Sequence, residues 1–187
     1  MIQERIAARY ARSVYELASE RNQTDAVLKD FRGLQDLLEQ SRDLQLFIQS
    51  PIIPSEKKIP VFKEIFQGNI HEVIMLLIEL LTRREREEVL GTIGLEYIKL
   101  YNKSNNIRPV RLSAATELED QQVQEIKTLL EKELSATIQI TPETDPELIG
   151  GVVLNFGDKV LDASVRHALR NARRNVLKDS DTFIEKI

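Results

Sequence analysis

The sequence predicts a mainly α-helical protein with a smaller α/β part toward its C-terminal end. In residues 4–101 the apolar residues recur at intervals of three or four, as they do on the buried side of a helix. Between residues 110 and 140 two short segments instead alternate apolar with polar residues, which is typical of strands. Residues 147–167 indicate a strand, a tight turn at Gly157-Asp158, a second strand and a helix, because glycine adopts positive φ without a steric penalty.

Six helices are expected in the first part of the chain. Their expected ranges are 4–20, 24–40, 44–49, 54–68, 69–82 and 83–101. Thr24 is suited to cap the second helix, and Pro51 ends the third because a residue before proline disfavours helical backbone. Pro60 falls in about the first turn of the fourth helix, where proline is tolerated, and Gly68 suits its end.

The fifth predicted helix is apolar on nearly every side. Its apolar residues are Ile70, Val73, Ile74, Met75, Leu76, Leu77, Ile78, Leu80 and Leu81. Such a helix either lies at the centre of a bundle or offers an apolar face to a partner. The first helix has small residues at Ala7 and Ala18, which leave room for another helix to approach closely. The mixed charges of residues 83–88 are interpreted as a solvated face at the start of the sixth helix.

The helical pattern breaks at residues 102–106, and the period of the apolar residues then changes. Strands are expected at residues 110–114 and 136–140, separated by a helix that starts at a capping box formed by Thr116 and Glu119. A strand, a helix and a strand of these lengths imply a right-handed crossover with parallel pairing.

Three regions follow from these assignments. Residues 1–105 form the helical part, and residues 106–178 form an α/β domain with a loop at 142–146, a β-hairpin and a C-terminal helix starting at Ser164. Residues 179–187 are a tail to which no role is assigned.

Composition excludes several classes of site. The chain of 187 residues has no cysteine, which excludes disulfides, thiolate metal sites and cysteine nucleophiles. With two histidines, a metal site built from several imidazoles is implausible. No stretch approaches the roughly 18 apolar residues of a membrane span. Residues 1–12 mix acidic and basic side chains and resemble neither a secretory signal nor a transit peptide, which favours the bacterial cytoplasm or a trimmed mature form.

The last predicted helix, residues 165–178, has a basic face opposite its apolar seam. The cations of this face are Arg166, Arg170, Arg173, Arg174 and Lys178. They are either a solvated face, with positive charge toward the helix C-terminus, or a patch for an acidic partner or a phosphate backbone. A nucleic-acid-binding adaptor is therefore an alternative function, although the net charge of −4 opposes it.

No catalytic, cofactor-binding or metal site is expected, and the protein is predicted not to be an enzyme. Asp158 and Asp162 could form a carboxylate pair, but aspartate is favoured at turns and before helices for backbone reasons. Gly150-Gly151 lacks the context of a phosphate-binding loop. Ser164 lacks a nucleophile elbow, and its position suits a helix cap.

Several motifs together resemble one family. The segment LIGGVVLNFGDKVLDASVRHAL closely resembles the signature near the C-terminus of the delta subunit of F-type ATP synthases, the bacterial counterpart of the mitochondrial oligomycin-sensitivity-conferring protein. ARYARSVYELA, the Ser50-Pro51 pair, EYIKLYN and PVRLSAA extend the resemblance over nearly the whole chain.

The resemblance implies a fold and a role. It implies a six-helix N-terminal bundle, a small α/β domain, and a non-catalytic stator subunit that joins the catalytic head to the peripheral stalk on the cytoplasmic face of the bacterial inner membrane. In this family the N-terminal segment of an alpha subunit lies in a groove between the first and fifth helices. Tyr10, Ser13, Ile74 and Ile78 would line that groove; the alternative for Ile74 and Ile78 is ordinary bundle core.

The resemblance also implies that the C-terminal domain receives the C-terminal ends of the stalk's b subunits. It assigns no individual residues to that contact. Val176 and the basic face of residues 166–174 are the candidates that the sequence offers.

Overall fold

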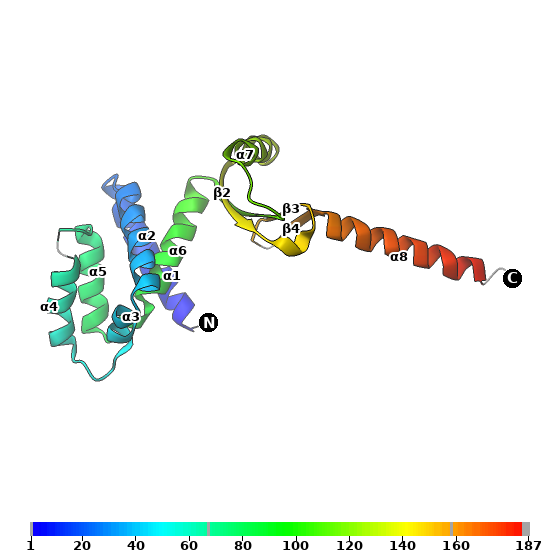
Figure 1. Ribbon diagram of the computed structural model, residues 1–187. Coiled ribbons are helices and arrows are strands. Elements are labelled where there is room, and N and C mark those ends of the chain that lie inside the picture. The colour runs from blue at the N-terminus through cyan, green and yellow to red at the C-terminus, as the bar shows by residue number, and fades with distance from the viewer. Residues whose placement is uncertain (1, 67, 158, 185–187) are drawn as a thin grey trace. The chain divides into compact units, whose positions relative to one another are not determined.

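A computed structural model describes residues 2–66, 68–157 and 159–184, with side chains described in residues 3–66, 68–157 and 159–174. Within these residues the chain has eight α-helices, two 3-10 helices and a four-stranded mixed sheet, and is therefore mainly helical with a small sheet (Figure 1). The chain divides into two compact units, Met1–Asn105 and Asn106–Ile187. No described helix is long and apolar enough to cross a membrane.

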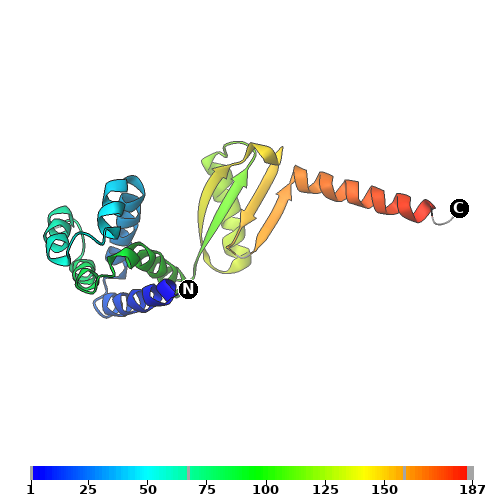
Figure 2. The same cartoon turned by 90° about the horizontal axis from the view of Figure 1, so that it is seen from below.

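The first unit is built from helices (Figures 1 and 2). Its elements are α1 (Ile2–Glu20), α2 (Thr24–Gln40), α3 (Arg42–Gln49), α4 (Ser55–Phe66), α5 (Glu72–Arg83), the 3-10 helix η1 (Glu87–Val89) and α6 (Leu90–Ser104). Helix α6 packs against α1 and α2, and α4 packs against α5. Small residues on α1, including the fully buried Ala7 and Ala11, permit the close approach of α6.

Tyr97 of α6 is fully buried in the core of the first unit. Its ring centroid lies 4.8 Å from that of Phe31 on α2 and 5.6 Å from that of Tyr15 on α1. The Tyr97 hydroxyl donates a hydrogen bond to the Thr24 carbonyl at 3.1 Å, so the one polar atom of this buried ring is satisfied. Three helices are thus joined through one aromatic side chain.

Some helix limits differ from the prediction. Thr24 is the first helical residue of α2 rather than its cap, and the preceding Gln23 makes no capping hydrogen bond with its side chain. Helix α5 begins at Glu72, later than predicted, because the His71 ring nitrogen accepts the backbone N–H of Val73 at 3.3 Å and caps the helix there. Pro60 lies inside α4, beyond its first turn.

The charged segment at residues 83–88 does not begin the sixth helix. Helix α6 begins at Leu90, after the short helix η1. The interpretation of the segment as a solvated face is wrong for Glu87, which is 7% exposed and forms an ion pair with the buried ammonium of Lys58. Lys58 Nζ also donates to the Ile48 carbonyl at 3.1 Å.

The second unit is a sheet with one helix on its apolar side. Its elements are β1 (Ile107–Ala114), α7 (Asp120–Leu134), β2 (Thr137–Thr144), the 3-10 helix η2 (Pro146–Leu148), β3 (Gly151–Asn155), β4 (Val160–Ser164) and α8 (Val165–Ile184). The strand order is β2-β1-β3-β4, with β1 parallel to β2 and the other pairs antiparallel. The parallel pair and the hairpin are confirmed.

Three details of the second unit correct the prediction. The capping box is formed by Glu119 and Gln122 rather than by Thr116 and Glu119, because the helix starts later. Pro142 lies within β2 instead of a loop, as an edge strand tolerates a missing N–H donor. Helix α8 continues to Ile184, so most of the predicted tail is helical; residues 185–187 lie outside the described residues, as does Asp158 of the predicted turn.

Candidate protein-binding site

Ile74 and Ile78, two of the predicted groove residues, lie in the core of the first unit. Their exposed fractions are 0% and 1%. Val73, Leu77 and Leu81 of the same helix are also buried. In this conformation neither isoleucine is open to a partner, so their contact with one stays a prediction that requires the helices to move apart.

Leu76 and Leu80 form the exposed apolar stripe of α5. They are 54% and 41% exposed, and four residues apart they lie on the same side of the helix. Helix α4 lies on a different side, since Lys63 Nζ of α4 contacts Glu79 Oε1 at 2.8 Å and Ser55 Oγ donates to the Thr82 carbonyl at 2.7 Å. Successive residues of a helix are about 100° apart around its axis, so Thr82 lies well over 90° from both Leu76 and Leu80. The stripe therefore does not face α4. Helix α5 also contacts α1 and the 3-10 helix η1.

Tyr10 and Ser13, the other two predicted residues, lie on α1 at the border of the core. Tyr10 is half-buried and packs against the core, while Ser13 is exposed and its hydroxyl donates to the Arg9 carbonyl at 3.2 Å. Helix α6 contacts the Tyr15 side of α1. Tyr10, Ser13 and the half-buried Leu17 share another side of the helix, by their spacing of three and four.

These residues are the accessible ones of two helices that contact each other. We call Tyr10, Ser13, Leu17, Leu76 and Leu80 the α1–α5 face. The prediction from sequence missed Leu17, Leu76 and Leu80. Their apolar character was visible, but only the positions of α4 and α6 show which sides of α1 and α5 remain accessible.

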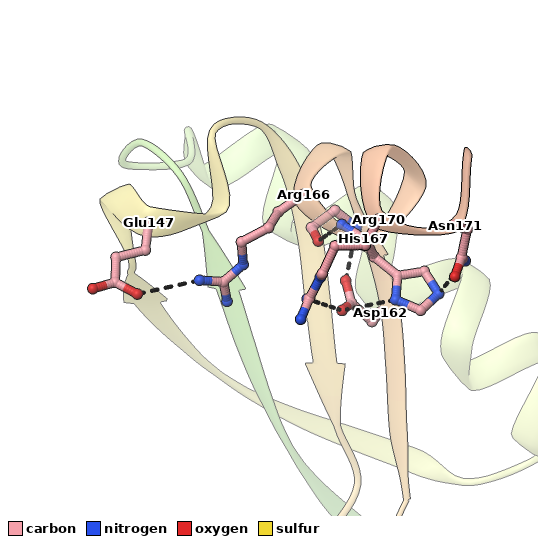
Figure 3. Close-up of polar contacts among 7 residues, drawn as sticks. Glu147, Asp162, Arg166, His167, Arg170 and Asn171 are labelled. Atoms are coloured by element: carbon pink, nitrogen blue, oxygen red, sulfur yellow. Dashed lines mark hydrogen bonds and ion pairs between the residues drawn. The ribbon is translucent and has the colours of Figure 1, made fainter. Parts of the chain in front are cut away.

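The start of α8 is fixed by a polar network that Figure 3 shows. Asp162 Oδ1 accepts the backbone N–H of Ser164 at 3.0 Å, and Ser164 Oγ accepts the backbone N–H of His167 at 3.1 Å. Asp162 Oδ2 lies 3.4 Å from His167 Nδ1 and 3.9 Å from Arg170 Nη2. Hydrogen bonds from Ser164, and then the charges of His167 and Arg170, hold the pKa of Asp162 below its usual value.

This network supports the structural interpretation of the aspartate and the serine. Ser164 caps the helix, as predicted, and Asp162 orders the turn that leads into it. Among the described residues no group of three or more histidine, aspartate or glutamate side chains could hold a metal ion. The arrangement serves to start a helix in a fixed direction.

The basic face of α8 is partly engaged within the chain. Arg166 Nη1 contacts Glu147 Oε2 at 3.2 Å, and Arg170 approaches Asp162 (Figure 3). Arg173 and Arg174 are exposed. The side chains of Val176 and Lys178 lie outside the described residues.

Comparison with known proteins identifies similar chains. A family model described as ATP synthase delta (OSCP) subunit matches residues 6–176. Proteins named ATP synthase subunit delta are similar over nearly their whole length. The one from Chloroherpeton thalassium is 33% identical over 91% of this chain and 93% of its own. The one from Crocosphaera subtropica is 35% identical over 88% and 90%.

A solved structure shares the fold. A chain of the Toxoplasma gondii mitochondrial ATP synthase hexamer superposes with a TM-score of 0.73 at 20% identity, covering 91% of this chain and 97% of that one. At this level of identity the match concerns the fold alone.

Proposed function

Because the chain belongs to the ATP synthase delta (OSCP) subunit family, we propose that each of its two units holds a different subunit of the synthase. The protein is a non-catalytic stator subunit that links the catalytic head to the peripheral stalk. In our proposal the first unit, a six-helix bundle formed by α1–α6, binds the N-terminal segment of an alpha subunit. The second unit binds the C-terminal ends of the b subunits, and the protein lies on the cytoplasmic face of the bacterial inner membrane.

The α1–α5 face is the observation that supports the alpha-subunit site. Two leucines of α5 are about half exposed, and two apolar side chains of α1, a helix that contacts α5, are partly buried. An amphipathic helix laid on such a face is a recurrent mode of recognition. Covering the exposed half of each leucine would contribute on the order of 1 kcal/mol, from the usual value for burying a whole leucine side chain.

Tyr10, Ser13, Ile74 and Ile78 remain our predicted groove residues, with Leu76 and Leu80 added. The buried pair Ile74 and Ile78 and the exposed pair Leu76 and Leu80 distinguish two modes of binding. A segment that lies on the closed surface contacts Leu76 and Leu80, whereas a segment that separates α1 from α5 also reaches Ile74 and Ile78. Truncation of Ile78 would destabilise the free protein as well, because Ile78 is buried.

The test is a calorimetric titration of the full chain with a synthetic peptide of the alpha subunit's N-terminal segment, which measures the binding affinity. We expect Leu76→Asp to weaken binding at least tenfold, because a charge would then have to be buried against the partner's apolar stripe. Leu46→Asp is the matched control, since Leu46 on α3 is 55% exposed and lies outside the α1–α5 face. Equal affinities for the two variants and the unmodified chain would rule out the face.

A further inference from the structure

A hollow of about 280 Å³ lies at the end of the first unit where α4 begins and α5 ends (Figure 1). Its walls come from the end of α3, the segment 50–55 that leads into α4, the first turn of α4 and residues 85–88 around η1. A water molecule occupies about 30 Å³ in the liquid, so the hollow has room for a small organic molecule or the end of a long side chain. We call it the acidic hollow, for the charges that line it.

The charged side chains around the acidic hollow are mostly negative. They are the carboxylates of Glu85, Glu87 and Glu88 and the ammonium of Lys58. Lys58 and Glu87 are buried and paired with each other, whereas Glu85 and Glu88 are exposed. Glu88 Oε1 accepts a hydrogen bond from Gln3 Nε2 at 3.0 Å, which brings no charge. Three negative charges against one positive charge favour a further cation in the hollow.

Glu87 has an unused acceptor at the acidic hollow. Its Oε1 accepts the hydrogen bond from Lys58 Nζ, but its Oε2 is buried and has no hydrogen-bond partner among the described residues. Lys58 Nζ also donates to the Ile48 carbonyl at 3.1 Å, so its donors are divided between two groups. A buried carboxylate oxygen that accepts no hydrogen bond destabilises the folded state, because it has lost its solvation by water. A donor supplied by a ligand would remove that cost.

The lining of the acidic hollow suits an organic cation. Its carboxylates do not converge as metal ligands do, since no group of three or more acidic or imidazole side chains in the described part of the chain could hold a metal ion. An ammonium group needs no such convergence, because its three N–H donors can each reach a different acceptor. The apolar side chains of Ile48, Pro51 and Ile53 complete the wall, and methylene groups can lie along them.

We propose that the acidic hollow binds a primary ammonium group at the end of an alkyl stem, which a free diamine or a lysine side chain of a protein can supply. The ammonium group donates to the Glu87 carboxylate and is attracted by Glu85 and Glu88. The alkyl stem lies against Ile48 and Pro51. The lining residues lie outside the α1–α5 face, so the site does not depend on the proposed function.

The first experiment titrates the full chain with 1,5-diaminopentane and follows the NMR signals of residues 48–55 and 85–88. We expect saturable shifts in both segments, because both line the acidic hollow. The uncharged 1-pentanol should bind about tenfold more weakly or not at all, since hydrogen bonds from a charged donor are the stronger ones. Equal binding of the alcohol, or no saturable shift with the diamine and with N-acetyl-lysine methylamide, would overturn the proposal.

Variants of the carboxylates locate the binding. Glu87→Gln should weaken diamine binding about tenfold, because the amide carries no charge, and its oxygen can still accept from Lys58. Glu85→Gln should weaken it about threefold, because Glu85 is exposed and screened. Glu64→Gln is the matched control, since it removes an exposed carboxylate of α4 that does not line the acidic hollow.

The results of the three variants decide whether the hollow is the site. The Glu64→Gln variant should keep the affinity of the unmodified chain, and an equal loss in all three would show only a general attraction to an acidic protein. Circular dichroism checks that the Glu87→Gln variant folds. If it does not fold, Glu85→Gln combined with Glu88→Gln takes its place, because both side chains are exposed. Unchanged affinity of that double variant would then overturn the proposal.

A comparison of two probes identifies the source of the ammonium group. N-acetyl-lysine methylamide represents a lysine side chain of a protein, and 1,5-diaminopentane represents a free diamine. Tighter binding of the lysine derivative assigns the site to a protein partner, and tighter binding of the diamine assigns it to a free amine. In either case Glu87→Gln must weaken the tighter probe, and an affinity that this variant leaves unchanged would place the probe elsewhere and overturn the site.

Discussion

The two units differ in how completely they bury their own apolar residues. In the first, a continuous core joins α1 to α6, and Tyr97, Phe31 and Ile74 are wholly buried. In the second, the buried cluster among the described side chains consists of Val110, Leu112, Ile138 and Leu154, and Leu161, which pairs with Leu154, is 55% exposed. The first unit thus has a continuous core, whereas the sheet of the second unit keeps large apolar side chains exposed at its β4 edge.

The largest expected effect is the loss of the first unit's core. Tyr97→Ala removes a fully buried ring that joins three helices, and should lower the free energy of unfolding by about 3 to 5 kcal/mol. Chemical denaturation measures the change, and Ile52→Ala is the control because Ile52 is 88% exposed. Amide signals of the second unit should remain in NMR spectra when those of the first are lost. Simultaneous loss of both sets would show that the units do not fold independently.

The next effect concerns the buried ion pair of the first unit. Lys58→Met leaves the Glu87 carboxylate buried without its cation, and should cost about 3 kcal/mol. Lys58→Met combined with Glu87→Leu should recover most of this loss, because no buried charge remains. Denaturation of the two variants gives the comparison. Equal stability of the single and double variants would mean that the unpaired charge is not the cause.

The smallest effect concerns the polar network at the start of α8, where Asp162 is a surface group. Its pKa is lowered in the folded state, so its contribution to stability is present above the unfolded pKa and is lost as pH falls through the folded pKa. An NMR titration should give the Asp162 carboxyl a midpoint below the ordinary 3.8. Asp162→Asn should remove the accompanying acid transition in the signals of Ser164 and His167. A midpoint at or above 3.8 would contradict the hydrogen bonding drawn in Figure 3.

Features that depend on residues close together in the sequence were predictable. The Ser164 cap, the hairpin of β3 and β4 and the parallel pairing of β1 with β2 follow from residue type and period. The first residue of a helix was not predictable where an unexpected side chain caps it. The His71 ring caps α5, which therefore begins later than the apolar pattern suggested. The same applies to Glu119, which caps α7 in place of Thr116.

The candidate binding site was predictable only as far as its helices. Apolar residues on nearly every side of α5 identified the helix as unusual, but Ile74 and Ile78 have the same apolar character in the sequence as Leu76 and Leu80. Only the positions of α4 and α1 separate the buried pair from the exposed pair. Likewise, the exposure of Leu161 depends on where α7 crosses the sheet.

The sequence by itself determined the order of helices and strands, the change of architecture near residue 105 and the family. These depend on periodicity, turn chemistry and motifs, which are properties of neighbouring residues along the chain. The tertiary structure alone decided that Glu87 is buried against Lys58, and which leucines of α5 and β4 reach the surface. Burial is the sum of contacts with elements far away in sequence, so it is fixed only when those elements are in place.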